Sequence, residues 1–81
     1  MKIEVLFFAQ LREAIRDSRR VIDVEGTPVV SDVIAVIEKW PEWRAVSSLP
    51  LTFAVNERVV DAGHLLGDGD RLALLTPIQG G

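Results

Sequence analysis

The residues of this chain that could take part in chemistry are few, and the most distinctive lie at its C-terminus. The sequence ends in Gly80-Gly81, so the terminal α-carboxylate stands at the end of a thin backbone arm without side chains. From Leu72 onward no side chain is charged, which leaves this carboxylate as the only ionised group of the segment. Terminal glycines are typical of frayed chain ends, but they also suit a carboxylate that is presented to another protein's active site.

The other candidate groups do not form a catalytic or metal site. His64 is the only histidine and has no partner at a motif spacing, so we interpret it as an ordinary loop residue. Asp68 and Asp70 flank Gly69, but a calcium loop needs more ligands and a distal glutamate, so a turn is the better interpretation. The absence of cysteine excludes disulfides, thiolate metal sites and a cysteine nucleophile. We therefore predict that the chain is not an enzyme on its own and binds no metal or other cofactor.

Length and composition indicate one small folded domain. The chain has 81 residues, 48% hydrophobic and 26% charged, which is the balance of a globular protein rather than a disordered one. Its net charge of −3, without a stripe of lysine or arginine, argues against a nucleic-acid partner. The apolar segment Val5–Leu11 is too short to span a membrane and lacks a signal-peptide cleavage site. A small domain without disulfides suits the cytoplasm, where we expect the protein to act.

Hydrophobic spacing predicts the elements that position these groups. Strands are expected at residues 2–8, 20–25, 51–56, 58–60 and 71–76, and short helices at residues 9–17 and 42–45. The main helix is expected from about Val30, with apolar residues at helical spacing, until Pro41 stops it. One main helix covers only one face of such a sheet, so we predict an α+β domain over residues 1–76 with a four- to five-stranded sheet. Residues 77–81, from Pro77 onward, are predicted to form a flexible tail.

The second face of the predicted sheet has no helix to cover it. Alternation along the strands places Leu6, Phe8, Ala54, Ala73 and Leu75 on that face. An exposed apolar face of this kind is typical of a protein-binding surface. The sequence therefore predicts a docking face on the domain beside a terminal carboxylate on the tail.

Three internal segments and the terminus together resemble a known family. Val5–Glu13, Ala54–Asn56 and Leu66–Asp70, with Gly80-Gly81, are similar to the small subunit of molybdopterin synthase. The resemblance spans the whole chain and implies the ubiquitin-like β-grasp fold, with a mixed sheet. The chain departs from the family pattern at Leu74–Thr76, where bulkier aromatic residues or a second proline are common.

The resemblance also implies a function and its partners. An ATP-using adenylyltransferase would activate the Gly81 carboxylate, and a sulfur donor protein would convert it to a thiocarboxylate. The tail would then enter the large catalytic subunit of molybdopterin synthase and donate sulfur to cyclic pyranopterin monophosphate. In this interpretation the inserted residues are Pro77, Ile78, Gln79, Gly80 and Gly81. The residues expected to contact partners are Phe8, Arg12, Ala54, Val59, Ala73 and Leu75.

Two alternatives stay open at this point. One keeps the fold and changes the pathway to a sulfur carrier for thiamine or tRNA thiolation, or to a ubiquitin-like modifier. The helical segment Ala9–Asp17 favours the molybdopterin branch over the shorter thiamine carrier. The other alternative is a non-covalent β-grasp interaction module in which Gly80-Gly81 has no role.

Overall fold

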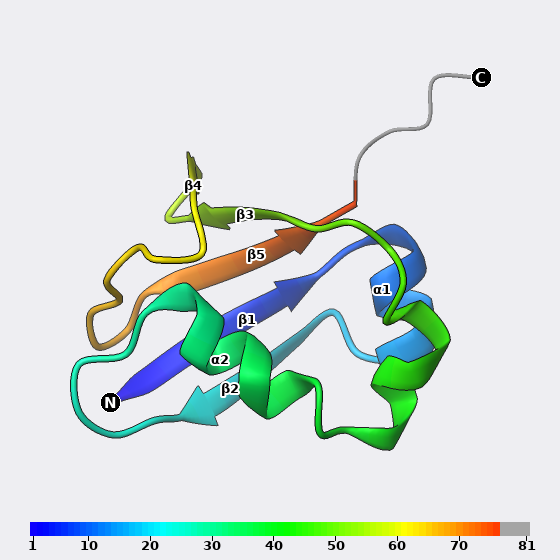
Figure 1. Cartoon of the computed structure of the whole chain (residues 1–81), viewed down its shortest axis with the longest axis horizontal. Coiled ribbons are helices and arrows are strands. Elements are labelled where there is room, and N and C mark those ends of the chain that lie inside the picture. Colours follow the sequence, from blue (N-terminus) through cyan, green and yellow to red (C-terminus); the bar gives the residue numbers. More distant parts are fainter. Residues whose placement is uncertain (77–81) are drawn as a thin grey trace.

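The computed structural model describes residues 1–76, in which one mixed β-sheet carries helices over one of its faces (Figure 1). In chain order the elements are β1 (Lys2–Phe7), α1 (Ala9–Ile15), β2 (Arg19–Asp23), α2 (Val30–Ile37), the 3-10 helix η1 (Pro41–Val46), β3 (Thr52–Val55), β4 (Arg58–Val60) and β5 (Arg71–Leu75). The strand order is β2-β1-β5-β3-β4, with β1 and β5 parallel at the centre and the other neighbours antiparallel. The predicted α+β class is confirmed. The predicted tail, residues 77–81, lies outside the described residues.

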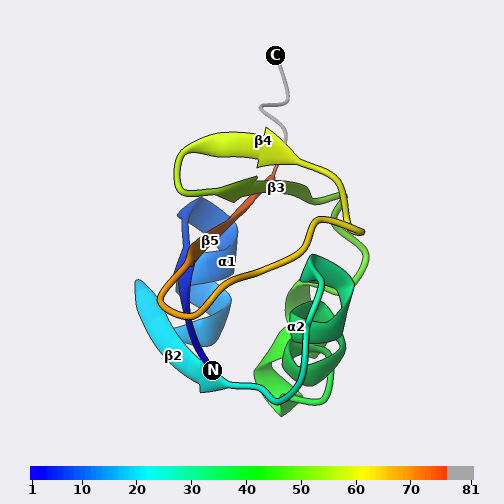
Figure 2. The same cartoon turned by 90° about the vertical axis from the view of Figure 1, so that its left-hand side faces the viewer.

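The core lies between the sheet and α2. Because successive side chains of a strand point to opposite faces, alternate residues of β1 and β5 lie on the helix side, which we call the inner face. These residues, and three of α2 at helical spacing, are 0–1% exposed: Ile3, Val5, Phe7, Leu72, Leu74, Val30, Val33 and Ile37. Figure 2 shows α2 beside this face, whereas no helix of residues 1–76 covers the opposite side of the sheet. We call that opposite side the outer face.

Helix α1 follows β1 almost directly and closes one end of the core. Phe8 is extended, and Ala9 then takes a positive φ of 48°, so the chain leaves the strand in a sharp turn. Leu11 and Ile15 pack into the core at helical spacing. The helix ends earlier than predicted because Arg16 adopts the left-handed conformation, with φ 67°.

Arg20 of β2 connects its strand to two helices, α1 and η1. Its Nε donates to Oδ2 of Asp17 at 2.8 Å, and its Nη2 donates to the carbonyl oxygen of Ile15 at 3.2 Å. The same Nη2 lies 3.4 Å from Oε2 of Glu42 in η1, and the guanidinium carbon lies 4.7 Å from the Trp40 ring centroid. The hydrogen bond to Asp17 raises the pKa of Arg20, although desolvation opposes that shift. Arg20 therefore fastens β2 to both α1 and η1.

The main helix α2 is shorter than the sequence predicted. It starts at Val30, where the Asp32 carboxylate accepts the backbone N–H of Val29 at 2.8 Å. It ends at Ile37, because the N–H of Trp40 bonds to the carbonyl of Ile37 in the tighter 3-10 pattern. That turn places Trp40 in an extended conformation, as the residue before a proline requires.

Candidate functional site

The outer face of the sheet has an apolar centre. Leu6 of β1 pairs with Ala73 of β5, and both side chains are half-buried. Phe8, just beyond β1, is 46% exposed, and Val59 of β4 is 74% exposed. Large apolar side chains rarely stay this exposed in a cluster unless another molecule covers them. Leu75, which is also half-buried, extends the same face toward the end of β5.

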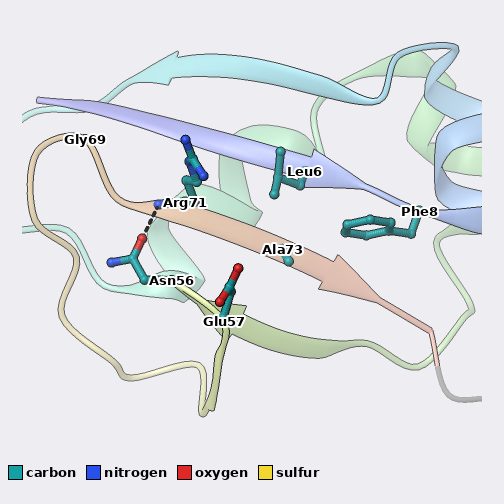
Figure 3. Close-up of a pocket in the computed structure, with 7 residues that line it drawn as sticks. All are labelled: Leu6, Phe8, Asn56, Glu57, Gly69, Arg71 and Ala73. Atoms are coloured by element: carbon teal, nitrogen blue, oxygen red, sulfur yellow. Dashed lines mark hydrogen bonds between the residues drawn. The ribbon is translucent and has the colours of Figure 1, made fainter.

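A hollow of about 370 Å³ opens on the outer face (Figure 3). Its lining combines three apolar side chains with a polar rim: Leu6, Phe8, Ala73, Asn56, Glu57, Gly69 and Arg71. Figure 3 shows Phe8 lying along the sheet at one end and Arg71 at the other, with Glu57 reaching in from the β3–β4 turn. The hollow is thus an apolar floor bordered by charged and amide groups.

Asn56 holds the two turns that form the polar rim. Its Nδ2 donates to Oδ1 of Asp70 at 3.0 Å, and its Oδ1 accepts the backbone N–H of Arg71 at 3.0 Å. Its backbone N–H also donates to the carbonyl of Arg71 at 2.9 Å. The other oxygen of Asp70 accepts the N–H of Gly67 at 2.7 Å and so closes the second turn. Two of the segments that carried the family resemblance are therefore hydrogen-bonded to each other.

The charges of the outer face are unevenly paired. Glu4 of β1 lies 3.6 Å from Arg19 and 3.9 Å from Arg71, so one carboxylate serves two guanidinium groups. Both arginine side chains are about two-thirds exposed. Glu57, in contrast, makes no ion pair with any of residues 1–76. The open charge beside the apolar floor is thus the carboxylate of Glu57.

The structure brings most of the predicted docking residues together. Phe8 and Ala73 line the hollow, while Val59 and Leu75 lie on the same outer face. Ala54 also lies on that face, between its cross-strand neighbours Ala73 and Val59. It is only 7% exposed, because a small side chain between two strands is shielded by its neighbours, so it offers little contact area.

Arg12 and the tail stand apart from this group. Arg12 is exposed on α1 and borders a separate polar hollow with other residues of that helix and the turn after it. It is not among the residues that line the hollow of the outer face. The predicted tail residues, Pro77 to Gly81, lie outside the described residues, and their insertion into a partner stays a prediction.

Sequence reasoning missed the polar rim as part of the site. Asn56 was predicted only as the end of the strand at residues 51–56, Glu57 only as the break before residues 58–60, and Gly69 only as part of a turn before the last strand. Because β3 and β5 are antiparallel, the end of β3 lies beside the start of β5, with Val55 opposite Leu72. If the antiparallel pairing of β3 with β5 had been inferred from the sequence, both turns would have been expected at the same end of the sheet.

Residues 1–76 contain neither a membrane-spanning helix nor a cluster of metal-binding side chains. No helix within residues 1–76 is long and apolar enough to cross a membrane. The same residues contain no group of three or more His, Asp or Glu side chains that could hold a metal ion. His64 is exposed in the loop before Leu66, as expected.

Comparisons with known proteins agree with this architecture. Among solved structures, SAMP1 from Haloferax volcanii superposes with a TM-score of 0.84 at 24% identity, with both chains covered completely. A complex of subunits 1 and 2 of the molybdopterin-converting factor from Helicobacter pylori contains a chain that matches with a TM-score of 0.74 at 24% identity, again over both full lengths. These neighbours share the fold, which is the ubiquitin-like β-grasp.

Sequence comparison identifies the family. A relative from Mycobacterium tuberculosis (strain ATCC 25618 / H37Rv), named molybdopterin synthase sulfur carrier subunit, is 32% identical over 83 residues, covering 100% of this chain and 99% of its own. A relative of the same name from Escherichia coli (strain K12) is 33% identical over 89 residues, covering 98% and 99%. The ThiS family pattern matches residues 5–81. The chain therefore belongs to the ThiS family, with the sulfur carrier subunits of molybdopterin synthase among its full-length relatives.

Proposed function

We propose that this chain is the sulfur carrier subunit of a molybdopterin synthase, and that its Gly81 carboxylate is the group that carries the sulfur. The observation that supports this most directly is the extent of the family match, which runs from residue 5 through the terminal glycines to residue 81. Full-length relatives with this role provide the second support. The protein would work in the cytoplasm, where ATP is at hand for the activation step.

The proposed chemistry takes place on Gly81 and is performed by partners. The carboxylate attacks the α-phosphorus of ATP in an adenylyltransferase, pyrophosphate leaves, and a mixed anhydride with AMP forms. A sulfur donor protein then delivers a sulfide equivalent, which attacks the carbonyl carbon of Gly81 and displaces AMP, leaving a thiocarboxylate. In the large catalytic subunit this sulfur passes to cyclic pyranopterin monophosphate, and water restores the carboxylate. The chain contributes no general acid or base to these steps.

The outer face would supply the affinity for both partners in turn. Ordering each tail residue costs about 1–2 kcal/mol of backbone entropy. Burial of Ile78, the only large apolar side chain of residues 77–81, returns only about 1.5–3 kcal/mol. A tail of this composition therefore cannot hold a partner alone. The exposed Phe8 and the apolar floor of the hollow can supply the binding free energy that the tail lacks.

The carrier role is tested by the intact mass of the purified chain. After incubation with ATP, the adenylyltransferase and a sulfur donor, we expect a mass gain that corresponds to exchange of one oxygen for sulfur at the C-terminus. A chain that lacks Gly81 should show no exchange and no sulfur transfer to the pterin precursor. Sulfur transfer by the truncated chain would rule out the proposal, and isopeptide conjugates in cell extract would point to a protein modifier instead.

The docking role is tested with a matched pair of charge substitutions. Phe8→Asp places a charge on the outer face, whereas Leu65→Asp places one on an exposed leucine of the loop that pairs with Val29. We expect the first to weaken binding to the large subunit at least tenfold, because the buried aspartate would have to be desolvated. The second should change it less than twofold. Equal effects, measured by calorimetry, would remove the outer face from the proposal.

A further inference from the structure

Building on the proposed function, we propose that Glu57 is a specificity-determining residue, and that the large subunit covers the hollow with a lysine or arginine side chain placed against it. Three features of the structure lead to this: the backbone conformation of Glu57, the position of its carboxylate, and the pairing of the other charges on the outer face.

The backbone at Glu57 favours a different residue. Asn56 and Glu57 form the two-residue connection between β3 and β4, with φ of 48° and 74°, which is the pattern of a type I′ hairpin turn. Asparagine suits the first position, and glycine is strongly preferred at the second, because an L side chain at positive φ is strained. Strain of this kind is concentrated at sites where the side chain serves binding or catalysis.

The side chain of Glu57 lies over apolar surface. Figure 3 shows its carboxylate directed from the turn across the sheet toward Ala73, rather than away from the hollow. Glu57 lines the hollow together with Leu6 and Phe8, and none of residues 1–76 forms an ion pair with it. A partner that filled the hollow with apolar groups alone would strip water from an unpaired carboxylate, which is costly.

Two arginines of the outer face do not meet that need. Arg71, at the opposite end of the hollow, lies 3.9 Å from Glu4, and Arg19 lies 3.6 Å from the same carboxylate. Both arginines are thus turned toward Glu4. Charge complementarity therefore calls for a cation from the partner at Glu57, beside an apolar group that covers Phe8 and Leu6.

The test compares Glu57→Gln with Glu25→Gln in binding to the purified large subunit, by calorimetry at low and at moderate salt. Gln has nearly the shape of Glu, so the first variant removes the charge and little else; Glu25 is exposed in the turn after β2. We expect Glu57→Gln to weaken binding about five- to tenfold at low salt and to reduce its salt dependence. Glu25→Gln should stay within twofold of the unsubstituted chain.

Glu57→Gly separates the effect of the Glu57 side chain on binding from the effect of its backbone conformation on stability. Glycine relieves the positive φ, so the melting temperature should rise by a few degrees, while the affinity should fall as it does for Glu57→Gln. A melting temperature that does not rise would contradict the assignment of strain. Binding by Glu57→Gln within twofold of the unsubstituted chain would overturn the inference and leave the proposed function standing. Failure of the unsubstituted chain to bind the large subunit would overturn the proposed function itself.

Discussion

Asn56→Ala is the substitution that most directly tests how the polar rim is held together. It removes the hydrogen bond from Nδ2 of Asn56 to Asp70 and leaves the N–H of Arg71 without its side-chain acceptor. It also places alanine at φ 48°, a conformation that asparagine tolerates better than other residues with a Cβ. The backbone bonds between β3 and β5 stay in place, so the fold is expected to persist in a less stable form.

The expected loss follows from these contacts. Each hydrogen bond is exposed and contributes about 0.5–1 kcal/mol, even though one of them ends on a carboxylate. The left-handed conformation costs alanine roughly 1 kcal/mol more than asparagine. The sum is about 2–3 kcal/mol, and a domain of this size loses about 4–8 °C of melting temperature for each kcal/mol. We therefore expect the melting temperature to fall by about 10–20 °C.

Asn56→Gly is the matched control, because glycine accepts the positive φ but makes neither side-chain hydrogen bond. Thermal and urea unfolding followed by circular dichroism should place it between Asn56→Ala and the unsubstituted chain, at a loss of about 1–2 kcal/mol. If both variants unfold within about 0.5 kcal/mol of the unsubstituted chain, the network around Asn56 does not stabilise the two turns. If the glycine variant is the less stable of the two, the conformational part of the estimate is wrong.

Three further substitutions, one of them with a matched control, test other parts of the fold. Ala9→Gly should leave stability unchanged or raise it by up to about 1 kcal/mol in urea unfolding, because it relieves the positive φ of 48°. Arg20→Ala should cost about 1–3 kcal/mol, since it removes the contacts to Asp17 and Trp40, whereas Arg19→Ala should cost less than about 0.5 kcal/mol. Phe7→Ala should cost about 3–5 kcal/mol, because Phe7 is 1% exposed, and a loss below about 1 kcal/mol would contradict its place in the core.

The sequence predicted the elements well where periodicity is strong. Alternation in β1 and β5, and the helical stripe that begins at Val30, placed the core on one face and left the other uncovered. Boundaries were less well predicted, because they depend on single backbone conformations. The left-handed Arg16 ends α1 early, and the 3-10 turn after Ile37 ends α2 before Pro41.

The apolar part of the candidate site was predictable and its polar part was not. Phe8 and Ala73 followed from alternation along a strand. Glu57 and Arg71 lie far apart in the sequence, and their common position depends on the antiparallel register of β3 and β5. The near-complete shielding of Ala54 likewise depends on which strands flank it. These features depend on which strands pair and in which register, and no local sequence pattern specifies that.

The parallel pairing of β1 and β5 has a practical consequence for handling this protein. Both strands run in the same direction, so the start of β1 lies beside the start of β5, and Lys2 accepts a backbone hydrogen bond from Gly69. At about 3.3 Å per residue, the six residues of β1 separate Met1 from the end of the sheet where Leu75 lies by roughly 20 Å. A fluorophore, a surface tether or a fused domain attached at Met1 would therefore stand clear of that end. Among residues 1–76, the Met1 amine forms an ion pair only with Asp23, whose side chain is 72% exposed. Labelling at Met1 should therefore leave the domain nearly as stable as before.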